Sequence, residues 1–509
     1  VYSFESALKI NPDFPDPYNN LTISYRKQGL FDNVSKSSKK AIELMINVIA
    51  TNPNDSETFH NLGLAYFEID SLEKSVESFE AAVSINPRFD EAYFSLGVAL
   101  ERLNCFDDAI KAFVKAEKIK ADTEYSLGNI LNAKMQSCNW INFSNLLGDL
   151  EKKIKDNKKI VYPFNLQSWV DDPALQRKAS EIKVNSDFPK NNILPSPGPY
   201  PKHSKIRIGY FSPDFRKHPV GFLTAGLFEA HDQDCFETYG FSLVPDTNDD
   251  INLRIKAGFD HFYDVYSMSN IEIVKLAHTL EIDIATDLAG FTADSRTDIF
   301  AMSVAPIQLS YIGYLGTMGA DYYDYLIADP IMIPKESQKY YVEKIAYLPS
   351  FQVNDSKDLP PNLTMIRKDL GLPETGFVFC CFNNTYKITP TTFDGWARIL
   401  KSVEGSVLIL YANNELSKVN LTKEIEQRGV DSSRLILGES IPKAEYLARY
   451  RVADLFLDTH PYNAGTTASD ALKMGLPMLT MKGKSYQARM GASIVNAVNL
   501  PELITHSQE

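Results

Sequence analysis

Residues 463–475, NAGTTASDALKMG, contain a glycine followed by two threonines and then a helical pattern. The start of a helix presents unpaired N–H groups and the positive end of the helix dipole, so it can hold an anion. Thr466 and Thr467 would add hydroxyl donors, and Gly465 would let a ligand approach the backbone closely. An ordinary threonine-capped helix start is the alternative interpretation.

Charged side chains follow two other runs of apolar residues. Asp214 and His218 lie in SPDFRKHPVG (212–221), and Lys387 lies in FNNTYKITP (382–390). Taken singly, each is more often an ordinary surface or capping residue. The carboxyl ends of parallel strands, however, meet at one edge of a sheet, where ligands bind. An acid, a histidine, a lysine and a helix start at strand ends therefore predict an anion pocket with an acid or base nearby.

The elements that must position these residues form two series of strands. Most of the strands are separated by helical patterns, and they are short apolar runs of the buried parallel type. We expect them at residues 206–215, 236–244, 282–290, 305–316, 376–384, 406–414, 433–440, 453–460 and 477–483. A connection near 350–375 divides them, which predicts two doubly wound α/β domains with a ligand cleft between them. No GxGxxG follows a strand and no GxxxxGK[ST] exists, so dinucleotide and P-loop sites lose their main support.

The first 120 residues repeat with a period of 34. Leu62, Gly63, Ala65, Phe79 and Ala82 recur as Leu96, Gly97, Ala99, Phe113 and Ala116. This period indicates tetratricopeptide repeats, helix–turn–helix units whose concave surface holds peptides or partner proteins. Asn-Pro pairs at 11–12, 52–53 and 86–87 end successive units, because proline cannot continue a helix. The first spacing is 41, which predicts one or two extra helical turns in the first unit.

Composition limits the remaining possibilities. The chain has 509 residues and a formal net charge of −13, which argues against a general nucleic-acid binder or a polybasic membrane protein. Its five cysteines form no CxxC pair, so we expect free thiols and a cytoplasmic location. No apolar run reaches membrane-spanning length, and no signal peptide is visible. The first residue lies inside a helical pattern, so we expect a fragment of a longer protein.

At this point the residues resemble the O-GlcNAc transferase and SPINDLY family of protein glycosyltransferases. The resemblance covers nearly the whole chain. Its motifs are IRIGYFSPDFRKHPVGFL, LAGFTADSRTDIFAMSVAPIQLSYIGYLGTMG, DYLIADPIMIP, FNNTYKITPTTFDGWARIL and ADLFLDTHPYNAGTTASDALKMGLPMLTMKGKSYQARMGAS. The family implies a GT-B type fold and a metal-independent, inverting transfer of a sugar from a nucleotide donor to Ser or Thr hydroxyls of proteins.

The patterns and the resemblance together predict a mixed fold, α plus α/β. A tetratricopeptide superhelix would occupy 1–123, and a helical connector ending in a Pro-rich linker would occupy 124–204. The N-terminal catalytic α/β domain would follow at 205–355. The C-terminal catalytic domain, which would bind the nucleotide sugar, would occupy 372–509, without the family's final helices.

The resemblance implies catalytic roles for three residues. His218, with Pro219 in its HP motif, matches the family's active-site histidine. Asp214 matches an acid of the same loop. Lys387 matches the lysine that contacts the donor diphosphate, and Asn384 falls beside the phosphates where other members often have Gln.

The resemblance also implies contacts to the donor. Gly465, Thr466, Thr467 and Asp470 match the helix start and the ribose contacts. Lys443, with Ile441 near it, falls at the position close to the nucleobase and ribose. Gly313 and Tyr314, in GYLGT, match the loop of the sugar pocket.

This assignment suggests how the reaction would proceed without a metal. The leaving nucleoside diphosphate gains negative charge, which Lys387 and the helix start at 466–470 would stabilise. No Asp or His cluster has metal-ligand spacing, so we expect no metal and no cofactor. The acceptor hydroxyl must lose a proton, and His218 or Asp214 could accept it directly or through water.

Several alternatives stay open. UDP-N-acetylglucosamine is the favoured donor. Gly465, however, stands where many members have His, and SPINDLY-like proteins, which use a GDP-fucose donor, also carry Gly there. Phe222 and Tyr446 replace other frequent histidines, so a catalytically degenerate repeat scaffold is the second class of function. The acceptor could also be a small molecule or glycan instead of a protein on the repeats. We expect no nucleic-acid or membrane partner, and a homodimer is compatible with the family.

Overall fold

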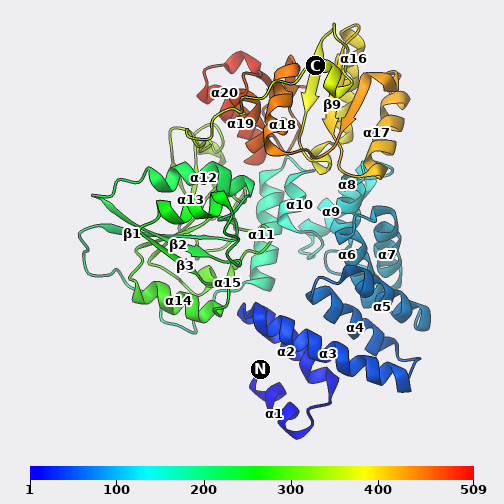
Figure 1. The fold of residues 1–509 in the computed structure, drawn as a ribbon, viewed down its shortest axis with the longest axis vertical. Coiled ribbons are helices and arrows are strands. Elements are labelled where there is room, and N and C mark those ends of the chain that lie inside the picture. The colour runs from blue at the N-terminus through cyan, green and yellow to red at the C-terminus, as the bar shows by residue number, and fades with distance from the viewer.

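The structure, a computed structural model, describes all residues 1–509. A helical arm forms one end of the molecule, two α/β domains form the rest, and a helical connector joins them (Figure 1). The arm contains α1 (Tyr2–Ile10), α2 (Pro15–Gln28), α3 (Phe31–Thr51), α4 (Ser56–Glu68), α5 (Leu72–Ile85), α6 (Asp90–Arg102) and α7 (Phe106–Ile119). These helices stack in sequence order, as the 34-residue period predicts.

Close helix packing explains the repeated small residues of the arm. A Cβ atom added to Gly63 would lie 2.5 Å from the Phe79 ring, and one added to Gly97 would lie 2.6 Å from the Phe113 ring. Both phenylalanines are fully buried. Helix α3 has 21 residues where α5 and α7 have 14, which confirms the extra turns expected in the first unit.

The connector consists of four helices and an irregular tail. The helices are α8 (Ser126–Gln136), α9 (Phe143–Lys155), α10 (Pro163–Gln167) and α11 (Pro173–Asp187). Residues 188–205 contain neither helix nor strand, in agreement with the predicted linker. One connector residue, Gln167, contacts both α/β domains. Its side-chain Nε2 donates to the carbonyl of Leu315 at 2.9 Å, and its backbone carbonyl accepts from Gln487 Nε2 at 3.0 Å.

The N-terminal α/β domain is built on a seven-stranded parallel sheet with the order β3-β2-β1-β4-β5-β6-β7. Its strands are β1 (Ile206–Ser212), β2 (Phe236–Ser242), β3 (His261–Asp264), β4 (Ile284–Asp287), β5 (Ile307–Ser310), β6 (Tyr325–Ala328) and β7 (Lys344–Tyr347). Its helices are α12 (Pro219–Glu229), α13 (Asp250–Gly258), α14 (Asn270–Thr279) and α15 (Asp298–Ala301). The sequence prediction missed β3, β6 and β7, which are four-residue strands at or next to the sheet edges.

The C-terminal α/β domain has a six-stranded parallel sheet with the order β10-β9-β8-β11-β12-β13. Its strands are β8 (Val378–Cys381), β9 (Val407–Tyr411), β10 (Leu435–Gly438), β11 (Leu455–Leu457), β12 (Met478–Met481) and β13 (Ile504–Thr505). Its helices are α16 (Pro390–Ser402), α17 (Glu415–Gln427), α18 (Lys443–Ala448), α19 (Thr466–Lys473) and α20 (Met490–Ala497). Only the two-residue β13 was not predicted.

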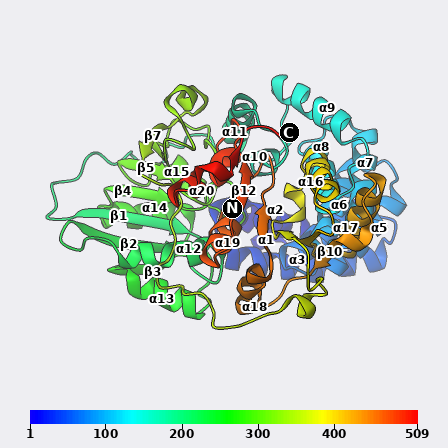
Figure 2. The ribbon, with the colours of Figure 1, turned by 90° about the horizontal axis from the view of Figure 1, so that it is seen from above.

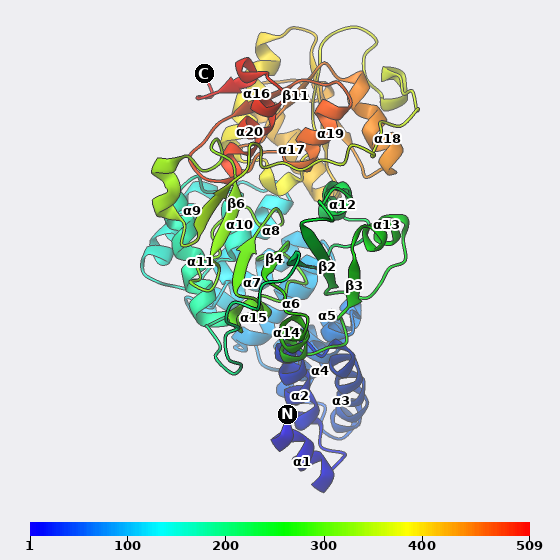
Figure 3. The same ribbon diagram turned by 90° about the vertical axis from the view of Figure 1, so that its left-hand side faces the viewer.

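One hydrophobic core joins the connector to both α/β domains. It contains 69 buried residues, drawn from all three parts. The arm holds separate clusters of 4 and 3 buried residues, and it shares a cluster of 8 with Ile130 of α8. Seen from above, α19 and α20 lie over the junction between the N-terminal sheet and the helical parts (Figure 2). The two chain ends lie at opposite ends of the molecule (Figure 3). No helix has the length and hydropathy that crossing a membrane requires, and the five cysteines form no disulfide.

Candidate functional site

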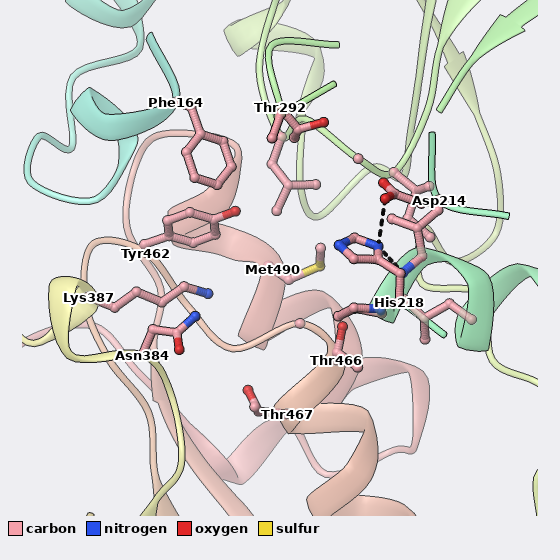
Figure 4. A pocket seen from close by; sticks show the side chains of 18 of the residues that line it. Phe164, Asp214, His218, Thr292, Asn384, Lys387, Tyr462, Thr466, Thr467 and Met490 are labelled. Carbon is pink, nitrogen blue, oxygen red and sulfur yellow. Dashed lines mark hydrogen bonds and ion pairs between the residues drawn. The ribbon is translucent and has the colours of Figure 1, made fainter. Parts of the chain in front are cut away.

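A cavity of about 680 Å³ lies where both α/β domains and the connector meet. A second cavity of about 370 Å³ adjoins it on the side of the C-terminal domain. The two share six lining residues, so they form one continuous cleft: Pro219, Leu223, Phe382, Asn384, Thr466 and Thr467. Figure 4 shows the larger cavity from close by.

The start of α19 forms one wall of this cleft. Thr466 and Thr467 are the first two helical residues, and the cap is Gly465, which has no side chain to accept a hydrogen bond. The backbone N–H groups of Thr466, Thr467 and Ala468 donate to no acceptor within the protein. The threonine-capped interpretation is therefore wrong, because the threonines are inside the helix. An uncapped helix start facing a cavity is suited to bind an anion.

Two buried residues that the sequence analysis missed hold this helix start in place. The Asp458 carboxylate accepts from the backbone N–H of Ala464 at 2.7 Å and from the Thr480 hydroxyl at 2.7 Å. Asn383 donates from Nδ2 to Thr459 Oγ1 at 2.8 Å and accepts a short hydrogen bond from the Thr467 hydroxyl. Asp458 follows β11 and Asn383 follows β8, the same strands after which the predicted residues lie. Only the fold shows that Asn383 forms hydrogen bonds with the segment after β11.

Lys387 approaches the same wall from the turn after β8. Its Nζ lies 3.8 Å from the centre of the Tyr462 ring and 3.5 Å from the carbonyl oxygen of Asn463. Burial lowers the pKa of its ammonium group to about 8. The ammonium group of Lys387 therefore has only weak contacts, with an aromatic face and a distant carbonyl. An anionic ligand would bind it more strongly than these contacts do. Asn384, next to it in the cleft, is exposed.

Asp214 and His218 form the opposite wall, on the N-terminal domain (Figure 4). Asp214 follows β1, and His218 caps α12. The Asp214 Oδ1 atom lies 3.3 Å from the His218 Nδ1 atom. Burial raises the pKa of Asp214 to about 6 and, together with Arg216, lowers the pKa of His218 to about 4. At neutral pH the pair is therefore an ionised carboxylate beside a neutral imidazole.

The imidazole has two competing partners at one nitrogen. The Val220 N–H donates to His218 Nδ1 at 3.3 Å, and Asp214 lies at the same distance from that atom. When Nδ1 carries the proton and donates to Asp214, Nε2 is left with a free lone pair towards the cavity. When Nδ1 accepts from Val220, Nε2 carries the proton and cannot act as a base. The carboxylate thus favours the tautomer that can remove a proton from a ligand.

The remaining predicted residues divide between the two cavities. Pro219 lines both, and Gly313 and Gly465 line the larger one. A Cβ atom on Gly313 would lie 2.0 Å from the carbonyl oxygen of Leu288, so this close approach requires glycine. Tyr314 is the exception, because its side chain is buried behind the loop and lines neither cavity. Its hydroxyl lies 3.2 Å from the Ser180 hydroxyl.

The smaller cavity contains Ile441, Lys443 and Asp470. Lys443 Nζ lies 3.7 Å from the centre of the Phe222 ring and 3.1 Å from the Asp358 carboxylate. The Asp470 carboxylate accepts from the Tyr446 hydroxyl at 3.0 Å. Burial raises the pKa of Asp470 to about 6. In a cavity of this size, aromatic rings can stack on a heterocycle. The lysine and the carboxylate can form hydrogen bonds to hydroxyl groups of the same ligand.

The larger cavity is also lined by two segments that the sequence analysis did not assign to the site. One is the connector at Tyr162, Phe164 and Asn165, and the other is the loop 291–294 between β4 and α15. Residues 291–294 lie inside one of the motifs that carry the family resemblance, but no role in the site was assigned to them. Throughout residues 1–509, no three His, Cys, Asp or Glu side chains gather in a group that could hold a metal ion.

Comparison with known proteins places this geometry in a family. The sequence profile of Glycosyl transferase family 41 matches residues 196–367 and 357–509, which include both walls of the cleft. The chain belongs to glycosyl transferase family 41. A tetratricopeptide repeat profile matches residues 56–89 and 90–123 in the arm of this family 41 protein.

Three similar proteins show how far the likeness extends. The probable UDP-N-acetylglucosamine–peptide N-acetylglucosaminyltransferase SEC of Arabidopsis thaliana is 36% identical over 302 residues, 58% of this chain and 31% of that protein. The probable UDP-N-acetylglucosamine–peptide N-acetylglucosaminyltransferase SPINDLY, also of Arabidopsis thaliana, is 29% identical over 314 residues, 60% of this chain and 34% of that protein. A mutant Thermobaculum terrenum O-GlcNAc transferase structure matches 97% of this chain and 87% of its own, with a TM-score of 0.69 and 26% identity. The chain spans about a third of the length of these curated relatives.

Proposed function

We propose that this family 41 chain is a protein O-glycosyltransferase that moves N-acetylglucosamine from UDP-N-acetylglucosamine to Ser or Thr hydroxyls, with inversion and without a metal. The observation that carries the proposal is the arrangement of the cleft. A lysine and an uncapped helix start on one domain face an Asp–His pair on the other across a single cavity. The names of the relatives support the sugar and the acceptor class.

The donor would extend across both cavities. Its diphosphate would lie against Lys387 and the free N–H groups of Thr466 and Thr467. Its nucleoside would occupy the smaller cavity, with Asp470 and Lys443 near the ribose and base. Its sugar would then project into the larger cavity, towards His218 and Gly313.

In the reaction, the acceptor oxygen forms a bond to the anomeric carbon as the bond from that carbon to the diphosphate oxygen breaks. The electron pair of the broken bond stays on UDP, where Lys387 and the start of α19 stabilise the developing charge. The acceptor proton passes to His218 Nε2, or through water to the Asp214–His218 pair. Attack on the face opposite the leaving group inverts the anomeric centre.

A protein acceptor would enter from the side that the connector and the arm form. Tyr162 and Phe164 supply aromatic surface at the cavity, where the Phe164 ring packs against Tyr462 across from His218 (Figure 4). The repeats would hold a longer segment of the same polypeptide, since stacked repeats form extended concave surfaces.

Calorimetric titration with UDP in the presence of EDTA tests the proposal. We expect UDP to bind the native chain, and Lys387→Ala to weaken binding by about tenfold or more, since a charge-assisted contact is worth about 1.5–3 kcal/mol. Lys401→Ala is the matched control, because Lys401 is an exposed lysine on α16 of the same domain. Equal UDP affinity in the two variants would refute the diphosphate assignment.

A GDP-fucose donor is the second candidate, and Gly465 favours it. A side chain at this cap would project beside Met490 at the cavity wall, and glycine leaves that space free for a different donor sugar. Titration with GDP under the same conditions separates the two candidates. Preference for GDP would replace the N-acetylglucosamine assignment, and binding of neither nucleotide would favour a catalytically degenerate scaffold.

A further inference from the structure

The first repeat touches the N-terminal α/β domain, although more than 230 residues separate the contacting segments. The turn between α2 and α3 lies against the segment between β3 and α14 (Figures 1 and 3). The Phe31 and Tyr266 rings stack with centres 5.5 Å apart. The Ser267 hydroxyl donates to Asp32 at 3.0 Å, and Asn270 donates to the carbonyl of Lys27 at 3.3 Å. We call this contact, residues 27–32 against 266–270 and Arg296, the clasp.

Arg296 is the centre of the clasp. It is only 5% exposed, and its guanidinium donates to Asn270 Oδ1 and to the Met268 carbonyl, each at 2.7 Å. Its guanidinium carbon lies 5.6 Å from the centre of the Phe31 ring. Gly29 covers it closely, since a Cβ atom on Gly29 would lie 2.0 Å from Arg296 Nη2. A buried arginine held by uncharged acceptors depends on each of them, because an unpaired buried charge is costly.

Arg296 belongs to the same loop that lines the larger cavity. This loop, residues 288–297, connects β4 to α15, and its segment from Phe291 to Asp294 forms the cavity wall on the side of the Asp–His pair. Asp294 lies 3.6 Å from Arg216 Nη2, and that guanidinium lies 3.8 Å from Asp214. The clasp therefore holds one end of a loop whose tip is linked through Arg216 to the catalytic pair.

We propose that the first repeat positions the acceptor wall of the active site by holding the 288–297 loop through Arg296. Arg296, Phe31 and Gly29 are positioning residues, since none of them lines the cavity. Releasing the clasp frees the loop between its anchor at Asp287, which accepts from the N–H groups of residues 289 and 290, and helix α15. The nucleotide wall lies on the other domain and keeps its contacts. The acceptor part of this inference rests on the proposed function, whereas the loop-holding part does not.

The test compares two glycine substitutions with similar backbone strain. Gly29 has φ +74° and Gly405 has φ +68°, but a Cβ atom on Gly405 meets nothing within 4 Å. We expect Gly29→Ala to raise amide hydrogen exchange across 288–297 by about tenfold, and Gly405→Ala to leave it unchanged. Phe31→Ala should act like Gly29→Ala, and Phe31→Tyr, which keeps the stacked ring, should restore native exchange.

Kinetics give the second measurement, with unstructured casein as the acceptor and UDP-N-acetylglucosamine as the donor. We expect Gly29→Ala and Phe31→Ala to raise the KM for casein by about fivefold or more. UDP affinity and the slow hydrolysis of the donor without casein should match the Gly405→Ala control, which a generally destabilised chain would not do.

The outcomes separate the two proposals. Identical exchange at 288–297 in Gly29→Ala and Gly405→Ala overturns the clasp, whatever the nucleotide result. Raised exchange with an unchanged KM for casein overturns the acceptor-wall role. Absence of UDP binding in the native chain refutes the proposed function and the acceptor role with it, while the exchange experiment still decides whether the first repeat holds the loop.

Discussion

The Asp214–His218 pair and Lys387 place three titrating groups around one cavity, with pKa values on both sides of neutrality. Asp214 titrates near 6, His218 near 4 and Lys387 near 8, each moved from its ordinary value by burial. Catalysis as proposed needs the carboxylate ionised, the imidazole neutral and the ammonium charged. All three conditions hold together only between about pH 6 and pH 8.

We therefore predict a bell-shaped pH profile of kcat/KM with limbs near pH 6 and pH 8. Activity falls below pH 6 because Asp214 takes up a proton, and falls above pH 8 because Lys387 loses its charge. Asp214→Asn should lower the plateau and remove the acid limb. Lys387→Arg should remove the basic limb, because a guanidinium stays charged. An acid limb that stays at pH 6 in Asp214→Asn would show that another group controls it.

Residue types and spacing predicted that Asp214, His218, Lys387 and the start of α19 share a pocket, and the resemblance to the family supplied the other predicted residues. The predicted residues other than Tyr314 line one of its two cavities, because they follow strands whose ends meet at one edge. Asp458 and Asn383 were missed because a buried carboxylate or amide has no sequence signal beyond its type. The sequence placed Asp214 and His218 in one loop, but only the structure shows that Asp214 Oδ1 lies 3.3 Å from His218 Nδ1.

At the level of single elements, the repeats depend on contacts between a glycine and a phenylalanine ring. Gly97 in α6 is buried against Phe113 in α7, and the same contact recurs between Gly63 and Phe79. Any added methyl group must push the two helices apart or force the ring out of its rotamer. The 34-residue period indicated stacked helix pairs, and this contact within each pair depends on nearest neighbours only.

We predict that Gly97→Ala lowers the free energy of unfolding of the arm by about 1–3 kcal/mol, through overpacking against Phe113. Gly148→Ala is the matched control in another helix. Gly148 is exposed within α9 and nothing lies within 4 Å of its added Cβ, so alanine should stabilise by about 0.5–1 kcal/mol through helix propensity. Urea denaturation followed by circular dichroism measures both. Equal effects of the two substitutions would argue against the packing explanation.

Two of the four strands that the sequence analysis missed lack an apolar run of sufficient length. Strand β3 has exposed residues at both ends and β13 has two residues, so neither shows a buried apolar run. The predicted strand at 305–316 is real only from Ile307 to Ser310. The rest of that apolar run is a loop, and its residues pack against neighbouring loops instead of neighbouring strands. Tertiary contacts therefore decided what short apolar runs could not.

At the scale of the whole molecule, the connector belongs to the core of the α/β half. Leu131, Met135 and Leu166 are fully buried in the 69-residue cluster that also contains strands of the C-terminal domain. Gln136 and Ser137 at the end of α8 accept hydrogen bonds from side chains of that domain. No sequence pattern indicated this role, because buried helices of a connector and of a separate domain have the same periodicity.

We predict that residues 124–509 fold without the arm and unfold in one cooperative transition with native UDP affinity. Residues 205–509 should aggregate, because removal of the connector exposes the apolar surface that its helices cover. Calorimetric unfolding and UDP titration of the two truncated chains check this. A soluble, nucleotide-binding 205–509 chain would show that the connector is dispensable for the core.

The clasp also constrains how this molecule can change in evolution. Stacked repeats rotate steadily around a superhelix, so inserting one 34-residue unit between α3 and α8 would carry the α2–α3 turn away from Arg296. Repeat arrays usually lengthen or shorten by duplication and loss of whole units. Here the clasp fixes the number of repeat units between itself and the connector. New units can be gained freely only on the N-terminal side of α2, whereas any change on the other side must build a new clasp at the same time.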